Sequence, residues 1–218
     1  MKIGIALWSL GQAKTFAEFE TLLDVAASTG VKAVQPWCLD ESRWGVQCAL
    51  DPDRCATPPQ RSNVRKACEK RGLAISALCA QQAGGANTMG GFGEDDSGLD
   101  SRIEKTRRAL RLATDLGTKI ITAHIGPIPQ DRDARAYPRF LKSVISVMKE
   151  AERCGGYFAL ETGQESAEVL RQFIEDVGSP NLKVNFDPAN MLNYGTVASV
   201  KILGEYIVHT HAKDKHPV

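Results

Sequence analysis

Short apolar runs alternate with longer amphipathic segments along this chain. The runs predict seven strands, at 2–9, 32–37, 74–81, 119–126, 157–163, 182–188 and 207–214. The segments between them carry apolar residues three or four positions apart, which predicts helices that bury one face. The first such set is Phe16, Phe19, Leu22, Leu23 and Ala26. Strict alternation of strands and helices indicates a parallel sheet joined by right-handed crossovers.

Signals for helix ends support this alternation. Thr15 with Glu18, and Ser101 with Glu104, have the spacing of a capping box at a helix start. Glycines stand where helices should end, each followed within a few residues by a predicted strand, at positions 30, 72, 117, 155 and 178. The recurrence of this helix-stop, strand-start phrase is a weak internal repeat of one βα unit.

Two α/β architectures fit this pattern, an open doubly wound sheet and a (β/α)8 TIM barrel. The first strand is not followed by G-x-G-x-x-G, which disfavours the dinucleotide-binding version of the open sheet. An eighth unit would bring the 218 residues near the ~250 typical of a barrel. We therefore predict one domain over 1–218, a (β/α)8 barrel that lacks its eighth βα unit in this chain. We expect the natural protein to continue past Val218.

Composition narrows the classes of function. Lys plus Arg is 27 and Asp plus Glu is 26, a net charge of +1, which argues against a nucleic-acid partner. No apolar run approaches the ~20 residues that span a bilayer, so we expect no membrane partner. The six cysteines form no C-x-x-C pair. A buried first strand explains the N-terminus better than a signal peptide, so we expect a cytoplasmic protein with reduced cysteines.

Two irregular stretches follow predicted strands. Residues 83–98 contain six glycines and no G-K-[ST], so they are not a phosphate-binding P-loop. They fit a lid over an active site as well as a surface insertion, because loops at the carboxyl ends of barrel strands form the site. Residues 38–59 are a second candidate wall of that site.

Polar residues inside the later strands carry the chemical signal. Glu161, Asp187 and His211 each lie near the carboxyl end of a predicted strand, and in a barrel those ends converge. Two carboxylates held close together repel each other, and a divalent cation such as Mn²⁺, Mg²⁺, Co²⁺ or Zn²⁺ removes that cost. Each residue also has a structural alternative: Glu161 could pair with Lys183 or Lys213, Asp187 could cap a turn, and His211 could be a core histidine.

Other residues are candidates for substrate contacts. His124 and Asn190 fit a place near the metal, and Lys213 fits either a catalytic role or an ion pair that orients the ligands. Trp8 and Trp37 end the first two strands and could form an apolar wall against a sugar face. We expect His209 to lie one layer below His211 and to serve the structure.

Three phrases resemble a known family. A-L-E-T-G at 159–163, N-F-D-P-A-N at 185–190 and H-T-H-A-K-D at 209–214 are similar to the xylose isomerase-like TIM barrel superfamily, and within it to the sugar phosphate isomerase/epimerase branch. The resemblance implies one divalent metal held by Glu161, Asp187, His211 and a second glutamate, which belongs to an eighth strand.

The same resemblance implies an activity. The expected reaction is isomerisation or epimerisation of a sugar, sugar phosphate or keto-polyol through a metal-stabilised enediolate, with Glu161 as an acid/base group. An inosose dehydratase-like lyase shares the fold and metal site and stays open. An endonuclease IV-like nuclease would need histidines at Asn190 and near Gln81, and an inactive binding scaffold is the non-enzymatic alternative. The expected partner is a small carbohydrate, and the oligomeric state, including a homo-oligomer, stays open.

Overall fold

The computed structural model of the protein describes residues 3–11, 13, 15–38, 58–81, 91–94 and 97–213. Each of the seven predicted strand positions contains a strand. In chain order the strands are β1 (Gly4–Ala6), β2 (Ala33–Gln35), β3 (Ala74–Ile75), β4 (Leu78–Cys79), β5 (Ile120–Ala123), β6 (Tyr157–Glu161), β7 (Leu182–Phe186) and β8 (Ile207–Thr210). The third predicted strand is split into β3 and β4.

The strands pair in the order of the chain, and every pairing is parallel. One sheet has the order β1-β2-β3 and the other the order β4-β5-β6-β7-β8. A bridge between Trp37 and Cys79 links the two sheets. Consecutive parallel pairing is the topology of a (β/α)8 barrel, and the described residues supply seven of its strand positions, as predicted.

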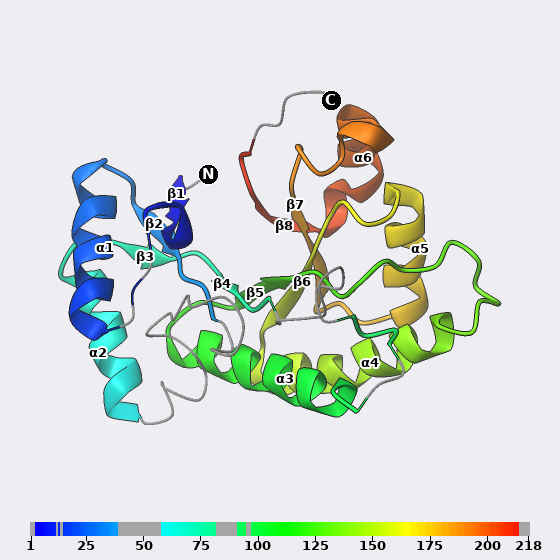
Figure 1. Ribbon diagram of the computed structural model, residues 1–218, viewed down its shortest axis with the longest axis horizontal. Helices are drawn as coiled ribbons and strands as arrows, with labels where there is room; N and C mark the ends of the chain where they lie inside the picture. The colour runs from blue at the N-terminus through cyan, green and yellow to red at the C-terminus, as the bar shows by residue number, and fades with distance from the viewer. Residues whose placement is uncertain are drawn as a thin grey trace.

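Helices line the outside of this row of strands. They are α1 (Phe16–Ser28), α2 (Pro58–Glu69), α3 (Leu99–Asp115), α4 (Tyr137–Cys154), α5 (Ala167–Val177) and α6 (Thr196–Leu203), with short 3₁₀ turns η1 (Leu7–Ser9), η2 (Leu192–Tyr194) and η3 (Gly204–Tyr206). In Figure 1, α1 and α2 lie beside β1–β3, whereas α3, α4 and α5 lie beside the later strands.

Of the two predicted capping boxes, one is confirmed. The Thr15 hydroxyl accepts the backbone N–H of Glu18 at 3.2 Å, and the Glu18 carboxylate accepts that of Thr15 at 3.0 Å. The prediction at Ser101 is wrong, because α3 begins at Leu99 and the first turn already bonds Arg102 N–H to the Gly98 carbonyl at 3.0 Å. Asp100 in that turn suits the positive end of the helix dipole.

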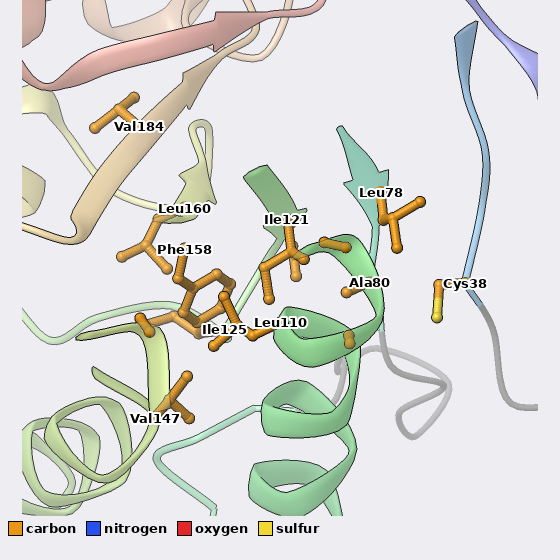
Figure 2. Close-up of a cluster of buried hydrophobic side chains, with 14 of the residues drawn as sticks. Cys38, Leu78, Ala80, Leu110, Ile121, Ile125, Val147, Phe158, Leu160 and Val184 are labelled. Carbon is orange, nitrogen blue, oxygen red and sulfur yellow. The ribbon is translucent and has the colours of Figure 1, made fainter. Parts of the chain in front are cut away.

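An apolar layer holds the helices against the strands. Phe158 and Leu160 of β6 and Val184 of β7 are buried against Leu110 of α3 and Val147 of α4 in one core cluster. Figure 2 shows these side chains between the strands and the two helices. Burying each such side chain contributes about 1.5–3 kcal/mol relative to leaving it exposed, so this layer supplies much of the stability.

The opposite face of the strands is polar and bonds across the interior. The His211 ring lies 2.8 Å from the Gln35 amide oxygen, which ties the end of β8 to β2. The His209 ring lies 3.3 Å from the Ser76 hydroxyl, between β3 and β4. Because β8 is the sequence neighbour of neither, these bonds show that the row of strands curves round on itself.

The pairing of β7 with β8 contains an irregularity. Val184 pairs with Ile207 but Asn185 pairs with His209, so Val208 is an extra residue in β8. A bulge of this kind lets the strand re-aim its side chains. Ile207 therefore joins the apolar layer while His209 faces inward with Asn185.

Some predicted features lie outside the described residues. These are most of the 83–98 and 38–59 stretches, which include Cys48 and Cys55, two of the six cysteines that we expect to be reduced. Cys38, Cys68, Cys79 and Cys154 are free thiols. Within the described ranges, no helix combines the length and the apolar character that crossing a bilayer requires.

Candidate metal centre

Three side chains converge at the carboxyl ends of neighbouring strands. Glu161 is the last residue of β6, Asp187 directly follows β7, and His211 directly follows β8. Each offers one ligand atom, and these atoms all lie within 4.8 Å of one another. Asp187 is fully buried, and the side chains of Glu161 and His211 are only 9% and 18% exposed. The barrel thus brings together the three residues that the sequence singled out.

Glu161 is held from two sides. Its Oε1 lies 2.9 Å from Nδ1 of His211, and its Oε2 accepts a short hydrogen bond from the Asn185 side-chain amide. Its partners are therefore neither Lys183 nor Lys213, the ion pairs considered as alternatives. Together the two contacts fix the orientation of the Glu161 carboxylate.

Asp187 combines a local and a site role. Its Oδ1 accepts the backbone N–H groups of Ala189 at 2.9 Å and Asn190 at 3.2 Å, which shapes the turn after β7. Its Oδ2 accepts the Lys213 ammonium at 2.8 Å. The Lys213 side chain is 54% exposed, so its ammonium can move away from the carboxylate and remain hydrated. Turn capping therefore does not compete with a role in the site.

Two amide side chains that the sequence analysis did not select complete the surroundings. Gln35 is the last residue of β2. Its amide oxygen lies 2.8 Å from Nε2 of His211, and its amide nitrogen donates to the Thr122 hydroxyl at 2.9 Å. Asn185 lies two residues before Asp187 on the same face of β7, and that alternation was the signal that could have found it. No candidate ligand lies near Gln35 in the sequence, so there was no comparable reason to select it.

His209 supports Asn185 from behind. Its Nδ1 lies 2.8 Å from the Asn185 Oδ1, and its Nε2 lies 3.3 Å from the Ser76 hydroxyl. Burial, and then the neighbouring His211, lower the pKa of His209 to about 4. A neutral ring follows at physiological pH. His209 bonds Asn185, which bonds the candidate ligand Glu161, and its ring meets the His211 ring edge-on at 5.6 Å.

The candidate substrate groups border the same region. The rings of Trp8 and Trp37 lie 5.3 Å apart, and Trp8 meets the His211 ring edge-on at 6.0 Å. Burial lowers the pKa of His124, and its Nδ1 has no hydrogen-bond partner within the described chain. Asn190 is already engaged, since its amide donates to the Thr162 carbonyl at 3.0 Å and accepts from Lys213 at 3.1 Å.

Glu165 is a buried carboxyl near this region that the sequence analysis missed. It lies in the loop after β6, and its Oε2 accepts the backbone N–H of Ile128, in the loop after β5, at 3.3 Å. Burial raises the pKa of Glu165 to about 7. The residue therefore links two loops at the same end of the strands and titrates near neutrality.

The donor set fits one divalent cation. Two carboxylates and an imidazole offer oxygen and nitrogen ligands of the kind that Mg²⁺, Mn²⁺, Co²⁺ and Zn²⁺ accept. Asp187 is buried beside Glu161, and a cation between them would relieve the repulsion of the two carboxylates. The contact of Lys213 with Asp187 shows that this position already attracts positive charge.

Comparison with known proteins agrees with this description. The family model described as xylose isomerase-like TIM barrel matches residues 23–218. None of the curated protein sequences matches the chain significantly. A xylose isomerase domain protein from Planctomyces limnophilus is 26% identical, with a TM-score of 0.72 over 88% of this chain and 68% of that one.

Two more distant structures share the fold. An L-ribulose 3-epimerase is 19% identical, with a TM-score of 0.75 over 96% of this chain and 69% of that one. The probable 3-DHS dehydratase AsbF from Bacillus anthracis is 17% identical, with a TM-score of 0.70 over 97% of this chain and 72% of that one. At these identities the likeness concerns the architecture alone.

Proposed function

Because the chain belongs to the xylose isomerase-like TIM barrel family, we propose that it is a divalent-metal-dependent isomerase or epimerase of a sugar, a sugar phosphate or a keto-polyol. The observation that carries the proposal is the convergence of Glu161, Asp187 and His211 within 4.8 Å at the carboxyl ends of three strands. The L-ribulose 3-epimerase with the same architecture supports this class of substrate.

The three converging residues would hold the cation. When bound, a divalent cation acts as a Lewis acid that polarises a substrate carbonyl. The chain then needs a base beside the carbon next to that carbonyl. Glu161 fits this role because Asn185 holds one carboxylate oxygen and the other faces the shared region with His211.

Glu161 would move a proton between carbon atoms. Its carboxylate accepts the proton from the carbon beside the carbonyl, and the electron pair left behind shifts toward the polarised oxygen. In an isomerisation the same carboxyl returns the proton to the former carbonyl carbon, and the hydroxyl proton on the original carbon passes to the former carbonyl oxygen as the new carbonyl forms. In an epimerisation the proton must return to the original carbon from the opposite face, which requires a second donor.

The surrounding residues suit a small carbohydrate. The paired rings of Trp8 and Trp37 offer an apolar surface to the C–H face of a sugar. His124 has a buried ring nitrogen without a hydrogen-bond partner in the described chain, and the Lys213 side chain is 54% exposed, so these are the two groups that we expect to bond hydroxyl groups when a sugar is bound. Asn190 would orient Lys213, to which it is already bonded.

The test is turnover in D₂O. The purified protein, loaded with Mn²⁺ or Co²⁺, is incubated with L-ribulose, D-fructose and their phosphates, and products are separated by chromatography and weighed by mass spectrometry. We expect a ketose epimer or aldose isomer that carries solvent deuterium at the reacting carbon. A product lighter by one water would instead identify a dehydratase.

Glu161→Gln separates chemistry from metal binding. The amide can still coordinate weakly but cannot carry a proton, so we expect turnover to fall by at least about 10²–10⁴-fold while some metal stays bound. Glu168→Gln, an exposed position early in α5, is the matched control and should keep wild-type turnover. Near-normal turnover in Glu161→Gln would remove Glu161 from the acid/base role.

A further inference from the structure

We propose that Gln35 is a positioning residue that keeps the proton of the neutral His211 ring on Nε2, so that the Nδ1 lone pair faces Glu161 and Asp187. The proposal rests on the proposed metal site and adds the residue that makes His211 able to serve it. Gln35 lies across the barrel interior from β8 and contacts the site through the His211 ring.

Gln35 is placed to do this by two hydrogen bonds. Its side chain is buried at 3% exposure, so both ends of its amide need partners. The amide nitrogen donates to the Thr122 hydroxyl of β5 at 2.9 Å. This bond turns the amide oxygen toward Nε2 of His211, 2.8 Å away. An amide oxygen only accepts, so Nε2 must carry the proton in this contact.

Asn185 contacts both Glu161 and the ring of His211. A carboxylate only accepts hydrogen bonds, so the Asn185 atom facing Glu161 is the amide nitrogen. That leaves the Asn185 oxygen toward Nδ1 of His209, which donates at 2.8 Å. The amide nitrogen of Asn185 also lies 3.2 Å from Nδ1 and 3.4 Å from Nε2 of His211, so this contact does not distinguish the two ring nitrogens.

Glu161 pulls in the opposite direction. Its Oε1 lies 2.9 Å from Nδ1 of His211 and would attract a proton to that nitrogen. A ring with its proton on Nδ1 has no lone pair there and cannot bind a cation through that atom. Gln35 therefore competes with Glu161 for the single proton of the neutral ring, and its loss should move the proton to Nδ1.

The experiment reads the two ring nitrogens directly. Protein labelled with ¹⁵N at histidine is studied by long-range ¹H–¹⁵N NMR, first without metal and then with Zn²⁺, a diamagnetic probe. The pH is set where the His211 ring is neutral. In the wild type we expect Nε2 of His211 to carry the proton in both states and Nδ1 to show the shift of a metal ligand when Zn²⁺ is added.

Gln35→Met removes the acceptor at nearly constant volume. We expect the His211 proton to move largely to Nδ1 in the metal-free protein, and the Zn²⁺ dissociation constant from calorimetry to rise roughly 10–100-fold. Gln35→Glu keeps an acceptor oxygen and should restore the proton to Nε2. Gln81→Met is the matched control: a buried glutamine bonded to the His124 backbone, whose loss should change neither reading.

Thr122→Val is a second variant should Gln35→Met fail to fold. It frees the Gln35 amide to turn and should weaken Zn²⁺ binding several-fold with a mixed tautomer. The proposal is overturned if Gln35→Met keeps the proton on Nε2 with wild-type Zn²⁺ affinity, or if the wild type carries it on Nδ1. Absence of Zn²⁺ binding by the wild type would count against the proposed function, while the metal-free spectra would still decide the role of Gln35.

Discussion

The two faces of strands β5–β8 are built on different principles. The outer face presents Phe158, Leu160 and Val184 to helices, through contacts that depend on volume and have no required direction. The inner face presents Asn185 and His209, whose contacts join particular atoms at 2.8–3.4 Å. The outer face therefore contributes most of the stability, and the inner face fixes the positions of the candidate ligand atoms.

This difference predicts how substitutions divide between the faces. A change on the outer face should alter the free energy of unfolding and leave ligand atoms in place. A change on the inner face should lower the free energy of unfolding less, because one hydrogen bond contributes only about 0.5–1.5 kcal/mol to stability. The same change should weaken metal binding more, because it shifts the candidate ligand atoms. Four variants test this division, from the largest expected effect on stability to the smallest.

Phe158→Ala should produce the largest loss. The ring is fully buried between β6 and the helices, so its removal leaves a cavity and should lower the free energy of unfolding by about 3–5 kcal/mol. Urea unfolding measures this loss. Phe16→Ala, at a 38% exposed ring, should cost far less. If the folded Phe158→Ala protein binds Zn²⁺ much more weakly than wild type, the two faces are not separable.

Gly163→Ala tests the point where the faces meet, in the loop after β6. Gly163 has a φ of +120°, and an added Cβ would lie 2.4 Å from the Cβ of Asn190. Backbone strain and overlap together should lower the free energy of unfolding by about 3–4 kcal/mol. Gly178→Ala shares a positive φ of +68° without a close neighbour, and should cost about 1 kcal/mol. Equal losses in the two variants would show that the contact with Asn190 is unimportant.

Glu165 sharpens the comparison through pH. Its pKa is raised from 4.5 to about 7 in the folded protein, so its favourable contribution is complete below pH 4.5 and is lost as the pH rises through about 7. The difference corresponds to about 3 kcal/mol. Glu165→Gln cannot ionise, so above pH 7.5 it should be more stable than wild type by about this amount.

Unfolding of Glu165→Gln and wild type is compared at pH 4.5, 6 and 8. The advantage of the variant should grow with pH and vanish at the acid end. An advantage that does not change with pH would mean that the Glu165 carboxyl titrates normally in the folded protein.

His209→Asn should have the smallest effect on stability. It removes the bonds to Asn185 and Ser76 but keeps a polar group, which predicts a loss of about 1–2 kcal/mol. Because Asn185 then loses the group that orients its amide, we expect Zn²⁺ affinity to fall by more than in Phe158→Ala. Calorimetric titration of the two variants checks this inversion, and equal affinities would contradict it.

The fold was largely predictable because the outer face obeys periodicity. Apolar spacing located all seven strand positions, and Thr15 with Glu18 marked a helix start through contacts three residues apart. Predictions failed where local signals compete or longer contacts decide. Ser101 has the spacing of a cap but lies inside α3, and the third strand is interrupted at Ser76, whose hydroxyl contacts His209.

The candidate site was predictable only in part. Glu161, Asp187 and His211 could be chosen because ionisable side chains that point into the barrel at the ends of strands are unusual. Asn185 shares that pattern, yet only its contacts with Glu161 and His209 give it a role. Gln35 had no local signal, because the atom it contacts belongs to a residue 176 positions later in the chain.

That separation also sets an order of events during synthesis. At about 5–20 residues per second, a ribosome makes Gln35 roughly 10–35 s before His211, 176 residues later. Throughout that interval β2 can pair with its neighbours, but the Gln35 amide oxygen lacks its partner in His211. The cluster of Glu161, Asp187 and His211 therefore cannot exist in a nascent chain that has formed most of its helices but lacks His211. The three candidate ligands are together only after β8 has taken its place.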